Sequence, residues 1–153
     1  MKTVKDFTWK QDMTVEQLVD NFGSVGYQAI ELYEASQVIL KMKKSGAKIF
    51  LTFTSNMVTS GLRGFFAQLI ELKMADILVT TSGSIEEDII KSLGDNFEIR
   101  TFNADDNQLH EQGENRIGNL VIKNESYMKF EDWMSITLED IYKTHKRIAA
   151  ADL

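Results

Sequence analysis

Cysteine and proline are both absent from the 153 residues. Without cysteine the chain can form neither disulfides nor thiolate metal sites, and no other metal site is predicted. Without proline, no interdomain linker can be located from composition. The apolar runs are far shorter than the roughly 20 residues that cross a bilayer, so we expect no membrane partner. Residues 1–12 lack the apolar core of a secretory signal, which favours a cytoplasmic location.

Positive charge is also scarce. The 17 lysines and arginines face 23 aspartates and glutamates, which gives a net charge of −6. A general nucleic-acid-binding protein needs a basic face to displace counterions, so we expect no nucleic-acid partner. The hydrophobic fraction of 43% is ordinary for a globular protein. At this length, residues 1–153 are predicted to form one domain with a core of its own.

Two apolar runs are each followed by a small, hydroxyl-rich turn and then by a segment of helical spacing. The first run covers 47–53 and the second 75–80. Runs with so few polar residues are typical of strands buried on both faces, as in a parallel sheet. Strand, loop and helix, repeated twice, form the unit from which nucleotide-binding α/β folds are built.

The other expected elements follow from apolar periodicity and capping residues. The helix over 60–73 is apolar all round, which predicts burial. Three or four strands and a last helix fall short of a doubly wound sheet, so we expect another chain to cover a sheet edge. The elements are helices beginning at Thr14 and spanning 27–43, 60–73, 84–93 and 127–148, strands over 97–102 and 117–122, and a polar surface excursion over 103–115.

The two turns, over 54–61 and 80–87, are the candidate ligand-binding loops. In a parallel sheet both lie at the carboxyl ends of strands, where ligands bind. Small residues let a ligand approach the backbone, and helix N-termini offer free N–H groups. A structural interpretation fits equally well: Ser84 with Glu87 has the spacing of a capping box, and Thr59 or Ser60 is suited to cap the preceding helix.

Electrostatics narrows the ligand class. The sequence contains neither G-x-G-x-x-G nor the P-loop motif, so neither standard phosphate fingerprint is present. The adjacent carboxylates of Glu86 and Glu87, in a first helical turn, would repel a pyrophosphate placed on them. They suit ribose hydroxyls or an amine cation. A site that holds a dinucleotide beside a polyamine would explain both features.

The wording of four segments resembles the deoxyhypusine synthase family. Besides the two loops, these are Asn-Arg-Ile-Gly-Asn at 115–119 and Asn-Glu-Ser-Tyr-Met-Lys-Phe-Glu-Asp-Trp at 124–133. The four blocks stand in the family's order. The resemblance covers residues 4–142 and corresponds to the N-terminal half of the family's usual length. Residues 1–153 are accordingly expected to be the N-terminal half of an NAD-binding domain.

The resemblance implies a fold and a reaction. Deoxyhypusine synthases have a Rossmann-like parallel sheet with helices on both faces, which this chain would contain incompletely and a partner chain would complete. They use NAD to oxidise spermidine. Its aminobutyl group then moves, through an imine on an enzyme lysine, to one lysine of the translation factor 5A precursor. The family enzymes are tetramers with sites at subunit interfaces.

The resemblance also implies roles for individual residues. Glu87 would meet the cofactor's ribose, and Glu86 with Glu87 would lie near the amines of spermidine. Ile117 and Asn124 are further candidates for the spermidine pocket. The residues expected to line NAD are Ser55, Asn56, Met57, Val58, Thr59, Thr81, Ser82 and Gly83.

Departures from the family pattern shape the prediction further. Ser82 and Ser84 stand where the family has alanine and glycine. The Trp-Gly-Lys segment with the imine-forming lysine is not among these residues. His110 and His145 are better explained as surface residues than as catalysts. We therefore expect no catalytic residue in this chain. It is predicted to be one of two pieces, from split genes or a cut precursor, in a tetramer-like hetero-oligomer.

Three alternatives remain open from the sequence. The chain could be a catalytically inactive regulatory subunit that stabilises an active relative, although such a subunit has no need to keep Glu86, Glu87 and the Thr-Ser-Asn run together. It could belong to a homospermidine synthase-like enzyme, since those are close relatives. A general NAD-binding module of the sirtuin or transhydrogenase kind would have loops richer in glycine and would lack the Phe-Glu-Asp-Trp block at 130–133.

Overall fold

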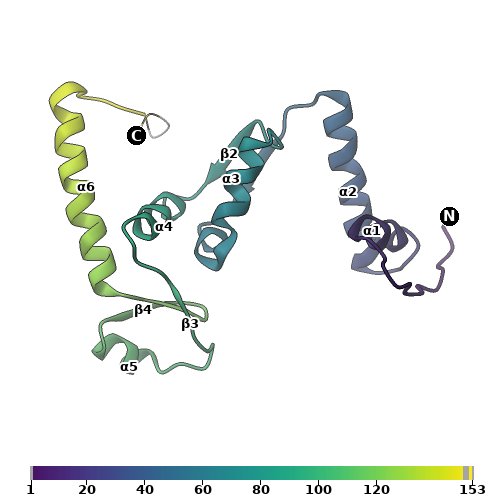
Figure 1. The fold of residues 1–153 in the computed structure, drawn as a ribbon, viewed down its shortest axis with the longest axis horizontal. Coiled ribbons are helices and arrows are strands. Elements are labelled where there is room, and N and C mark those ends of the chain that lie inside the picture. Colours follow the sequence, from purple (N-terminus) through teal and green to yellow (C-terminus); the bar gives the residue numbers. More distant parts are fainter. Residues whose placement is uncertain (1, 150–151, 153) are drawn as a thin grey trace. The chain divides into compact units, whose positions relative to one another are not determined.

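The computed structural model of the protein describes residues 2–149 and 152. They fall into two compact units, Met1–Ile49 and Phe50–Leu153, which are described separately below. Figure 1 shows the order of the helices and strands along the chain. Both candidate loops belong to the second unit, so this unit positions the site.

The first unit contains two helices, α1 (Val15–Phe22) and α2 (Gln28–Ser45). The predicted start of α1 is confirmed. Thr14 N donates to Gln17 Oε1 at 3.0 Å, and Gln17 N donates to Thr14 Oγ1 at 3.2 Å, which completes a capping box. The predicted helix over 27–43 also forms, and it ends at Gly46, whose φ of +69° closes the last turn.

The second unit begins with the predicted parallel strand pair. Strands β1 (Phe50–Phe53) and β2 (Ile77–Thr80) pair in parallel, with Phe50 opposite Ile77. Between them run a π-helical turn, η1 (Val58–Leu62), and helix α3 (Arg63–Glu71). Helix α4 (Gly83–Ser92) follows β2. The doubled strand–loop–helix unit is therefore confirmed.

The prediction that these strands are buried on both faces is wrong for the chain alone. Phe50 is 62% exposed, Ile77 43% and Val79 50%. Of α3, only Phe66 is buried among the described residues, so the expected burial of this helix is also wrong. Within the second unit, α3 and α4 face the same side of the strand pair. A two-stranded sheet with one layer of helices leaves the rest of its apolar surface open.

The later strands form a separate sheet, which corrects the expectation that they extend the parallel one. Strands β3 (Glu98–Ile99), β4 (Glu114–Ile117) and β5 (Leu120–Lys123) pair antiparallel in the order β3-β5-β4. Gly118, with a φ of +63°, and Asn119 make a two-residue hairpin turn between β4 and β5. Apolar spacing marks a strand but does not state which partner it pairs with.

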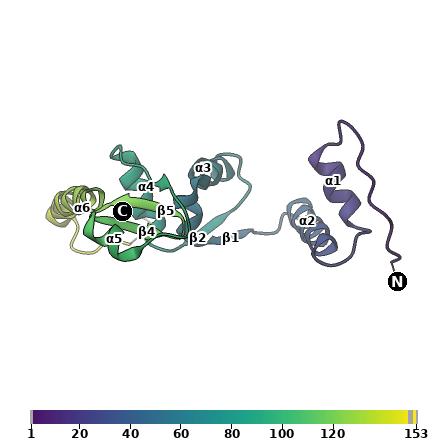
Figure 2. The ribbon, with the colours of Figure 1, turned by 90° about the horizontal axis from the view of Figure 1, so that it is seen from below.

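Two helices complete the second unit (Figure 2). The expected polar excursion contains helix α5 (Asp106–Glu111), capped by the Asp105 carboxylate. Helix α6 (Asn124–Thr144) begins three residues earlier than predicted and packs against α4 and β5. Every helix within residues 2–149 is too short or too polar to span a lipid bilayer. The buried hydrophobic residues of the described chain are Val58, Phe66, Ile90, Leu109, Val121 and Ile122.

Candidate functional site

The two candidate loops lie in direct contact, as their position after neighbouring parallel strands predicts. Ser55 N donates a hydrogen bond to Thr81 Oγ1 at 3.0 Å. Gly83 also approaches Ser55 closely: a Cβ added to Gly83 would lie 3.0 Å from both Cβ and Oγ of Ser55. A side chain at this position would therefore push the loops apart, which is the physical reason for glycine here.

The predicted capping box at the start of α4 is wrong. Helix α4 begins at Gly83, so Ser84 lies within it, and Ser82 at the N-cap makes no side-chain capping bond. Ser84 Oγ instead lies 2.5 Å from Thr80 Oγ1, and its side chain is buried. The serine that replaces the family's glycine is thus used to join β2 to α4. Glu87 is not held as a capping partner.

The hydroxyls of the first loop close their own turn rather than cap α3, which corrects the second structural interpretation. Thr59 Oγ1 donates to Ser55 O at 3.2 Å, and Ser60 Oγ donates to Met57 O at 2.9 Å. Gly61, with a φ of +108°, then redirects the chain into α3. Thr59 is buried, as is Val58, whereas Asn56 and Met57 are exposed.

Glu87 is the most unusual titratable group of the site. It is only 4% exposed, and burial raises the pKa of its carboxyl above the ordinary value of 4.5. Repulsion from Glu86 raises this pKa further, whereas hydrogen bonding from Thr59 and attraction to Lys91 lower it. Its Oε2 atom has no hydrogen-bond partner among the described residues. Buried oxygens of this kind are normally satisfied by a water or a ligand.

Lys91 joins α4 to the first loop. Its Nζ donates to Val58 O at 2.8 Å and to Thr59 O at 3.2 Å. Burial lowers the pKa of Lys91, and attraction to Glu87 opposes that shift. The sequence analysis missed this residue. Its spacing of four from Glu87 on one helix was the available signal, since such pairs face each other.

Helix α6 brings a third group to the acidic pair. Burial raises the pKa of the Tyr127 phenol, and the charges of Glu86 and Glu87 raise it further. Tyr127 belongs to the 124–133 block but was not among the predicted site residues. The contact of α6 with α4, which no local pattern reveals, places it there.

The two remaining candidates are held by the antiparallel hairpin. Ile117 ends β4. Asn124 begins α6, where its Oδ1 accepts from Asn115 Nδ2 at 2.5 Å and its N–H donates to Gly113 O at 2.8 Å. Asn124 thus lies three residues before Tyr127 on the same helix. The structure gives both residues fixed positions and assigns them no ligand.

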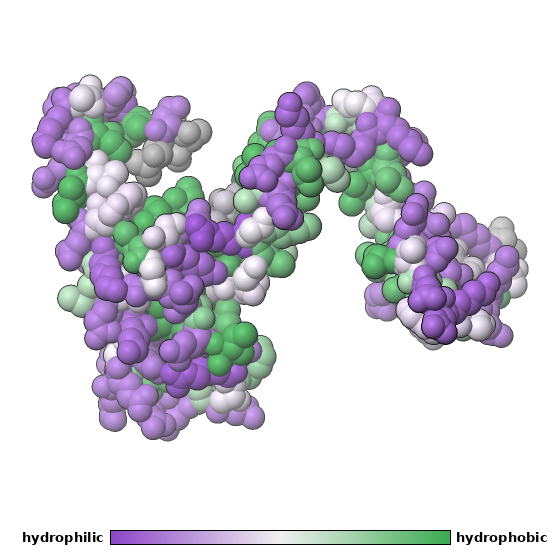
Figure 3. Space-filling model, viewed as in Figure 1, coloured by the Kyte–Doolittle hydropathy of each residue, from purple (hydrophilic) through white to green (hydrophobic). Residues whose placement is uncertain are grey.

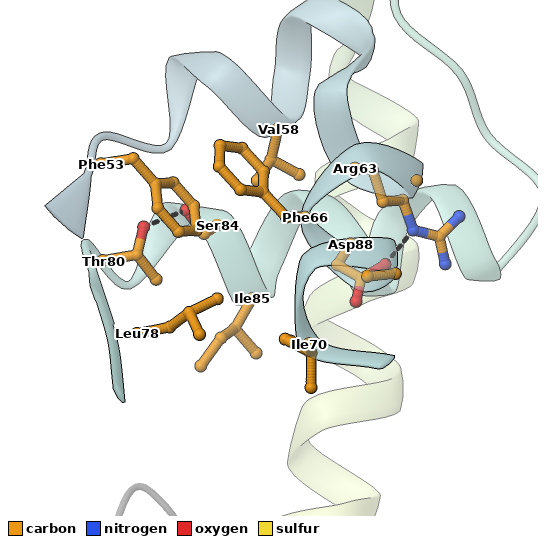
Figure 4. A pocket seen from close by; sticks show the side chains of 12 residues that line it. Phe53, Val58, Arg63, Phe66, Ile70, Leu78, Thr80, Ser84, Ile85 and Asp88 are labelled. Atoms are coloured by element: carbon orange, nitrogen blue, oxygen red, sulfur yellow. Dashed lines mark hydrogen bonds and ion pairs between the residues drawn. The ribbon is translucent and has the colours of Figure 1, made fainter. Parts of the chain in front are cut away.

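A cavity of about 560 Å³ lies on the inner face of the strand pair, between α3 and α4 (Figure 4). Its walls are mostly apolar, and the ion pair of Arg63 with Asp88 stands at its edge. Ser55, Thr81 and Glu87 are not among its lining residues, but Val58 of the first loop and Ser84 of the second are, so the cavity adjoins the loop site. The residues around it are Phe53, Val58, Arg63, Gly64, Phe66, Ala67, Ile70, Leu78, Thr80, Ser84, Ile85 and Asp88.

The histidines have the surface positions predicted for them. His110 on α5 and His145 at the end of α6 are both exposed. Within the described part of the chain, no group of three or more histidine, aspartate or glutamate side chains could hold a metal ion.

Comparison with known proteins identifies the family. The model of the deoxyhypusine synthase family matches residues 17–153, nearly the whole chain. The chain belongs to the deoxyhypusine synthase family.

Individual relatives agree with this assignment. A deoxyhypusine synthase of Neurospora crassa is 41% identical over 129 residues, covering 80% of this chain and 36% of its own length. One of Encephalitozoon cuniculi is 38% identical over 140 residues, covering 92% of this chain and 41% of its own. A crystal structure from Entamoeba histolytica, described as a deoxyhypusine synthase, matches with a TM-score of 0.56 and 27% identity, over 93% of this chain and 50% of that one. The chain thus spans at most half the length of these relatives.

Proposed function

We propose that this chain is the cofactor-binding and polyamine-binding part of a deoxyhypusine synthase. The complete enzyme transfers the aminobutyl group of spermidine to a lysine of the translation factor 5A precursor in an NAD-dependent reaction. Residues 1–153 form the N-terminal half of its NAD-binding domain. The imine-forming lysine lies outside these residues, on a second chain, in a cytoplasmic hetero-oligomer. The observation that carries the proposal is the contact between the two loops beside the unpartnered Glu87 oxygen.

The residues present fit NAD. When bound, NAD supplies the hydride acceptor for oxidation of the amine. The unpartnered Oε2 of Glu87 is the kind of acceptor that a ribose hydroxyl satisfies. The exposed Asn56 and Met57, with the small residues of the second loop, leave the backbone open to close approach. The residues proposed to line the cofactor are Ser55, Asn56, Met57, Val58, Thr59, Thr81, Ser82, Gly83 and Glu87.

The acidic pair provides the polyamine side of the site. Glu86 and Glu87 are neighbours whose negative charges attract an ammonium group, and Tyr127 closes this region from α6. An ammonium at this position also offsets the mutual repulsion that raises the Glu87 pKa. Ile117 and Asn124 are proposed to contact the far part of the same substrate.

The test is spermidine-dependent NAD reduction, measured on this chain with and without the C-terminal half of a deoxyhypusine synthase. We expect no activity from the chain alone and activity from the mixture. Glu86→Gln and Glu87→Gln should lower the activity of the mixture at least tenfold. Asp132→Asn, which removes one charge from an exposed position on α6, is the matched control and should leave it unchanged. Full activity without the second half would contradict the partner requirement.

Two further readouts separate the alternatives. NAD titrated into the assembled complex should protect the amides of 55–59 and 81–83, and a regulatory subunit would show no such contact. Transfer of the aminobutyl group to another amine, with none to the 5A precursor, would indicate a homospermidine synthase instead. The mass of the native complex, with every chain identified, tests whether the missing half is a separate chain.

A further inference from the structure

The ammonium group of Lys91 is bound to the backbone of the first ligand loop. Its Nζ atom donates to Val58 O at 2.8 Å and to Thr59 O at 3.2 Å, and it lies 5.6 Å from the centroid of the Phe97 ring. Both carbonyls belong to η1, the turn that is interrupted at Gly61. One side chain of α4 therefore holds two consecutive residues of the loop.

Thr59 is the residue that Lys91 shares with Glu87. Thr59 is buried, and hydrogen bonding from it reaches the Glu87 carboxyl. Glu87 and Lys91 are four residues apart on α4, so their side chains lie on the same face of the helix. The three residues thus form a closed set of contacts between α4 and the first loop. A change at Lys91 acts on the loop and on the carboxylate together.

The surroundings of these three residues are poor in water that could screen their charges. Val58 and Ile90 are buried, and Figure 3 shows hydrophobic surface over the segment that carries α3. In such surroundings the attraction between opposite charges is stronger than at an exposed site. The charge of Lys91 therefore has a larger effect on Glu87 than a surface lysine would have.

The other charged and titratable groups nearby do not replace Lys91. They are Glu86, Arg63, Asp88 and Tyr127. The first of them repels Glu87. Arg63 and Asp88 form an ion pair with each other, and their effects on Lys91 are opposite in sign. Burial raises the pKa of the Tyr127 phenol above 10.0, so it supplies no charge. Among the described residues, the charge that favours ionised Glu87 is that of Lys91.

We propose that Lys91 is a positioning residue for the cofactor: its bonds to Val58 and Thr59 hold the first loop against Glu87, so that one side chain sets both the loop and the carboxylate that meet NAD. This inference rests on the proposed function, in which Glu87 accepts a ribose hydroxyl. An ionised carboxylate accepts hydrogen bonds with both oxygens, whereas a protonated one carries a proton on one of them.

The proposal predicts how NAD affinity depends on pH. Burial raises the Glu87 pKa, and attraction to Lys91 opposes that rise. Because the ionised carboxylate is the form that binds, NAD affinity is lost as the pH falls through the folded pKa of Glu87. Without the charge of Lys91 this pKa is higher, so the loss begins at a higher pH.

The experiment is NAD titration, from about pH 5 to about pH 8, of this chain assembled with the C-terminal half of a deoxyhypusine synthase. Lys91→Met should weaken NAD binding at every pH, because the loop loses its donor. The loss should be roughly fivefold or more greater near pH 6 than near pH 8, because Glu87 keeps its proton to a higher pH. Lys91→Arg keeps the charge and the donors and should restore the natural pH profile. Lys129→Met, which removes a charge from the exposed ion pair with Asp95, is the matched control and should behave like the natural complex.

Two further measurements separate the loop from the charge. In a Glu87→Gln background, which cannot ionise, Lys91→Met should weaken NAD binding by the same factor at every pH. Carbon-13 NMR of the Glu87 carboxyl in the chain alone, which needs neither NAD nor a partner, should show titration at a higher pH in Lys91→Met. Exchange of the β3-β5-β4 amides reports whether each variant is folded. If Lys91→Met is unfolded, Lys91→Gln, which is uncharged and has N–H donors, takes its place with the same pH dependence expected.

The outcomes distinguish this proposal from the proposed function. A loss of NAD affinity that is the same at every pH would mean that Lys91 only stabilises the fold, and it would overturn the proposal. A Glu87 titration that Lys91→Met leaves unchanged would do so too. In both cases NAD binding by the natural complex leaves the proposed function in place. If the natural complex does not bind NAD, the proposed function fails, and the cofactor role of Lys91 fails with it even where the NMR titration shifts.

Discussion

The two loops of the site can touch because Gly83 has no Cβ atom. Gly83→Ala places a Cβ 3.0 Å from Ser55, so the first loop must move. We expect this variant to lose about 1–3 kcal/mol of unfolding free energy, the usual cost of overpacking. It should also weaken NAD binding by the assembled complex. Urea unfolding measures the first effect and NAD titration the second.

The control for this variant is Gly64→Ala in α3. An added Cβ there meets nothing within 4 Å, and alanine favours a helix, so stability should rise by about 0.5–1 kcal/mol. The double variant Ser55→Gly with Gly83→Ala removes the clash and should restore the loop. If Gly83→Ala behaves like Gly64→Ala, the loops are not in the contact described.

Glu87 makes stability depend on pH in a defined direction. Its pKa is raised in the folded chain, so the folded state binds the proton more tightly than the unfolded state. The contribution of Glu87 to stability is fully present below about pH 4.5, its unfolded value, and is lost as the pH rises through the folded pKa. Glu87→Gln cannot ionise. Relative to the natural chain, it should therefore gain stability between pH 4 and pH 7.

Urea unfolding at the two pH values measures this difference. Glu71→Gln, which removes the same charge at an exposed position on α3, corrects for the change in net charge. A Glu87→Gln stability difference that does not vary with pH would show that the carboxyl is not desolvated as described.

At the scale of residues, the sequence predicted correctly those contacts that follow from the parallel pairing of two strands. Ser55, Thr81 and Gly83 come together because the carboxyl ends of neighbouring strands meet at one edge. The burial of Ser84 and the bonds of Lys91 were not predicted, because both depend on how α4 packs on the first loop. The spacing of a capping box shows only that a cap is possible. Here the Ser84 hydroxyl bonds the Thr80 hydroxyl instead.

At the scale of elements, Lys91 connects α4 with the π-helical turn. Lys91→Met keeps the length of the side chain but leaves two carbonyl oxygens without their donor. It also removes a charge that lowers the Glu87 pKa. We expect a loss of about 1.5–3 kcal/mol, as for other hydrogen bonds to charged groups. Amides of 58–62 should exchange faster in this variant.

Lys129→Met is the matched control for that prediction. Lys129 Nζ bonds the Asp95 carboxylate at 2.9 Å, but the lysine side chain is 58% exposed. Exposed ion pairs contribute about 0–1 kcal/mol, so this variant should be nearly neutral. Equal losses in the two variants would mean that the bonds of Lys91 to the loop add nothing specific.

Apolar periodicity predicted most of the helices and strands, but it did not predict which strands pair with each other. The strands expected at 97–102 and 117–122 exist in part, yet they join an antiparallel sheet. The antiparallel pairing has a local cause, because Gly118 and Asn119 form a two-residue hairpin turn that places β5 directly beside β4. Without a turn assignment, the regular alternation of strand and helix upstream favoured a continued parallel sheet.

At the scale of the molecule, the accessible surface area is larger than that of a compact folded protein of the same mass. The accessible surface is 11916 Å². A compact monomer of 17.5 kDa is expected to expose about 7,900 Å². Even two separate units of these sizes would expose only about 9,400 Å². The excess is consistent with a chain that spans at most half the length of its relatives.

This excess predicts a solution property. The chain alone should bind the dye ANS and should associate with itself as its concentration rises, because large apolar patches are exposed. Addition of the C-terminal half should lower the dye fluorescence severalfold. If the chain stays monomeric at high protein concentration and does not raise the fluorescence of ANS, these apolar surfaces are already covered.

The bare edge of β1 also has a consequence for the cell. Among the described residues β1 pairs only with β2, and an unpaired strand edge is a template for unwanted pairing. If the two halves are made separately, any surplus of this one is a substrate for chaperones and proteases. Synthesis of the halves would then have to be balanced, and depletion of one should lower the steady-state abundance of the other without any change in its messenger RNA.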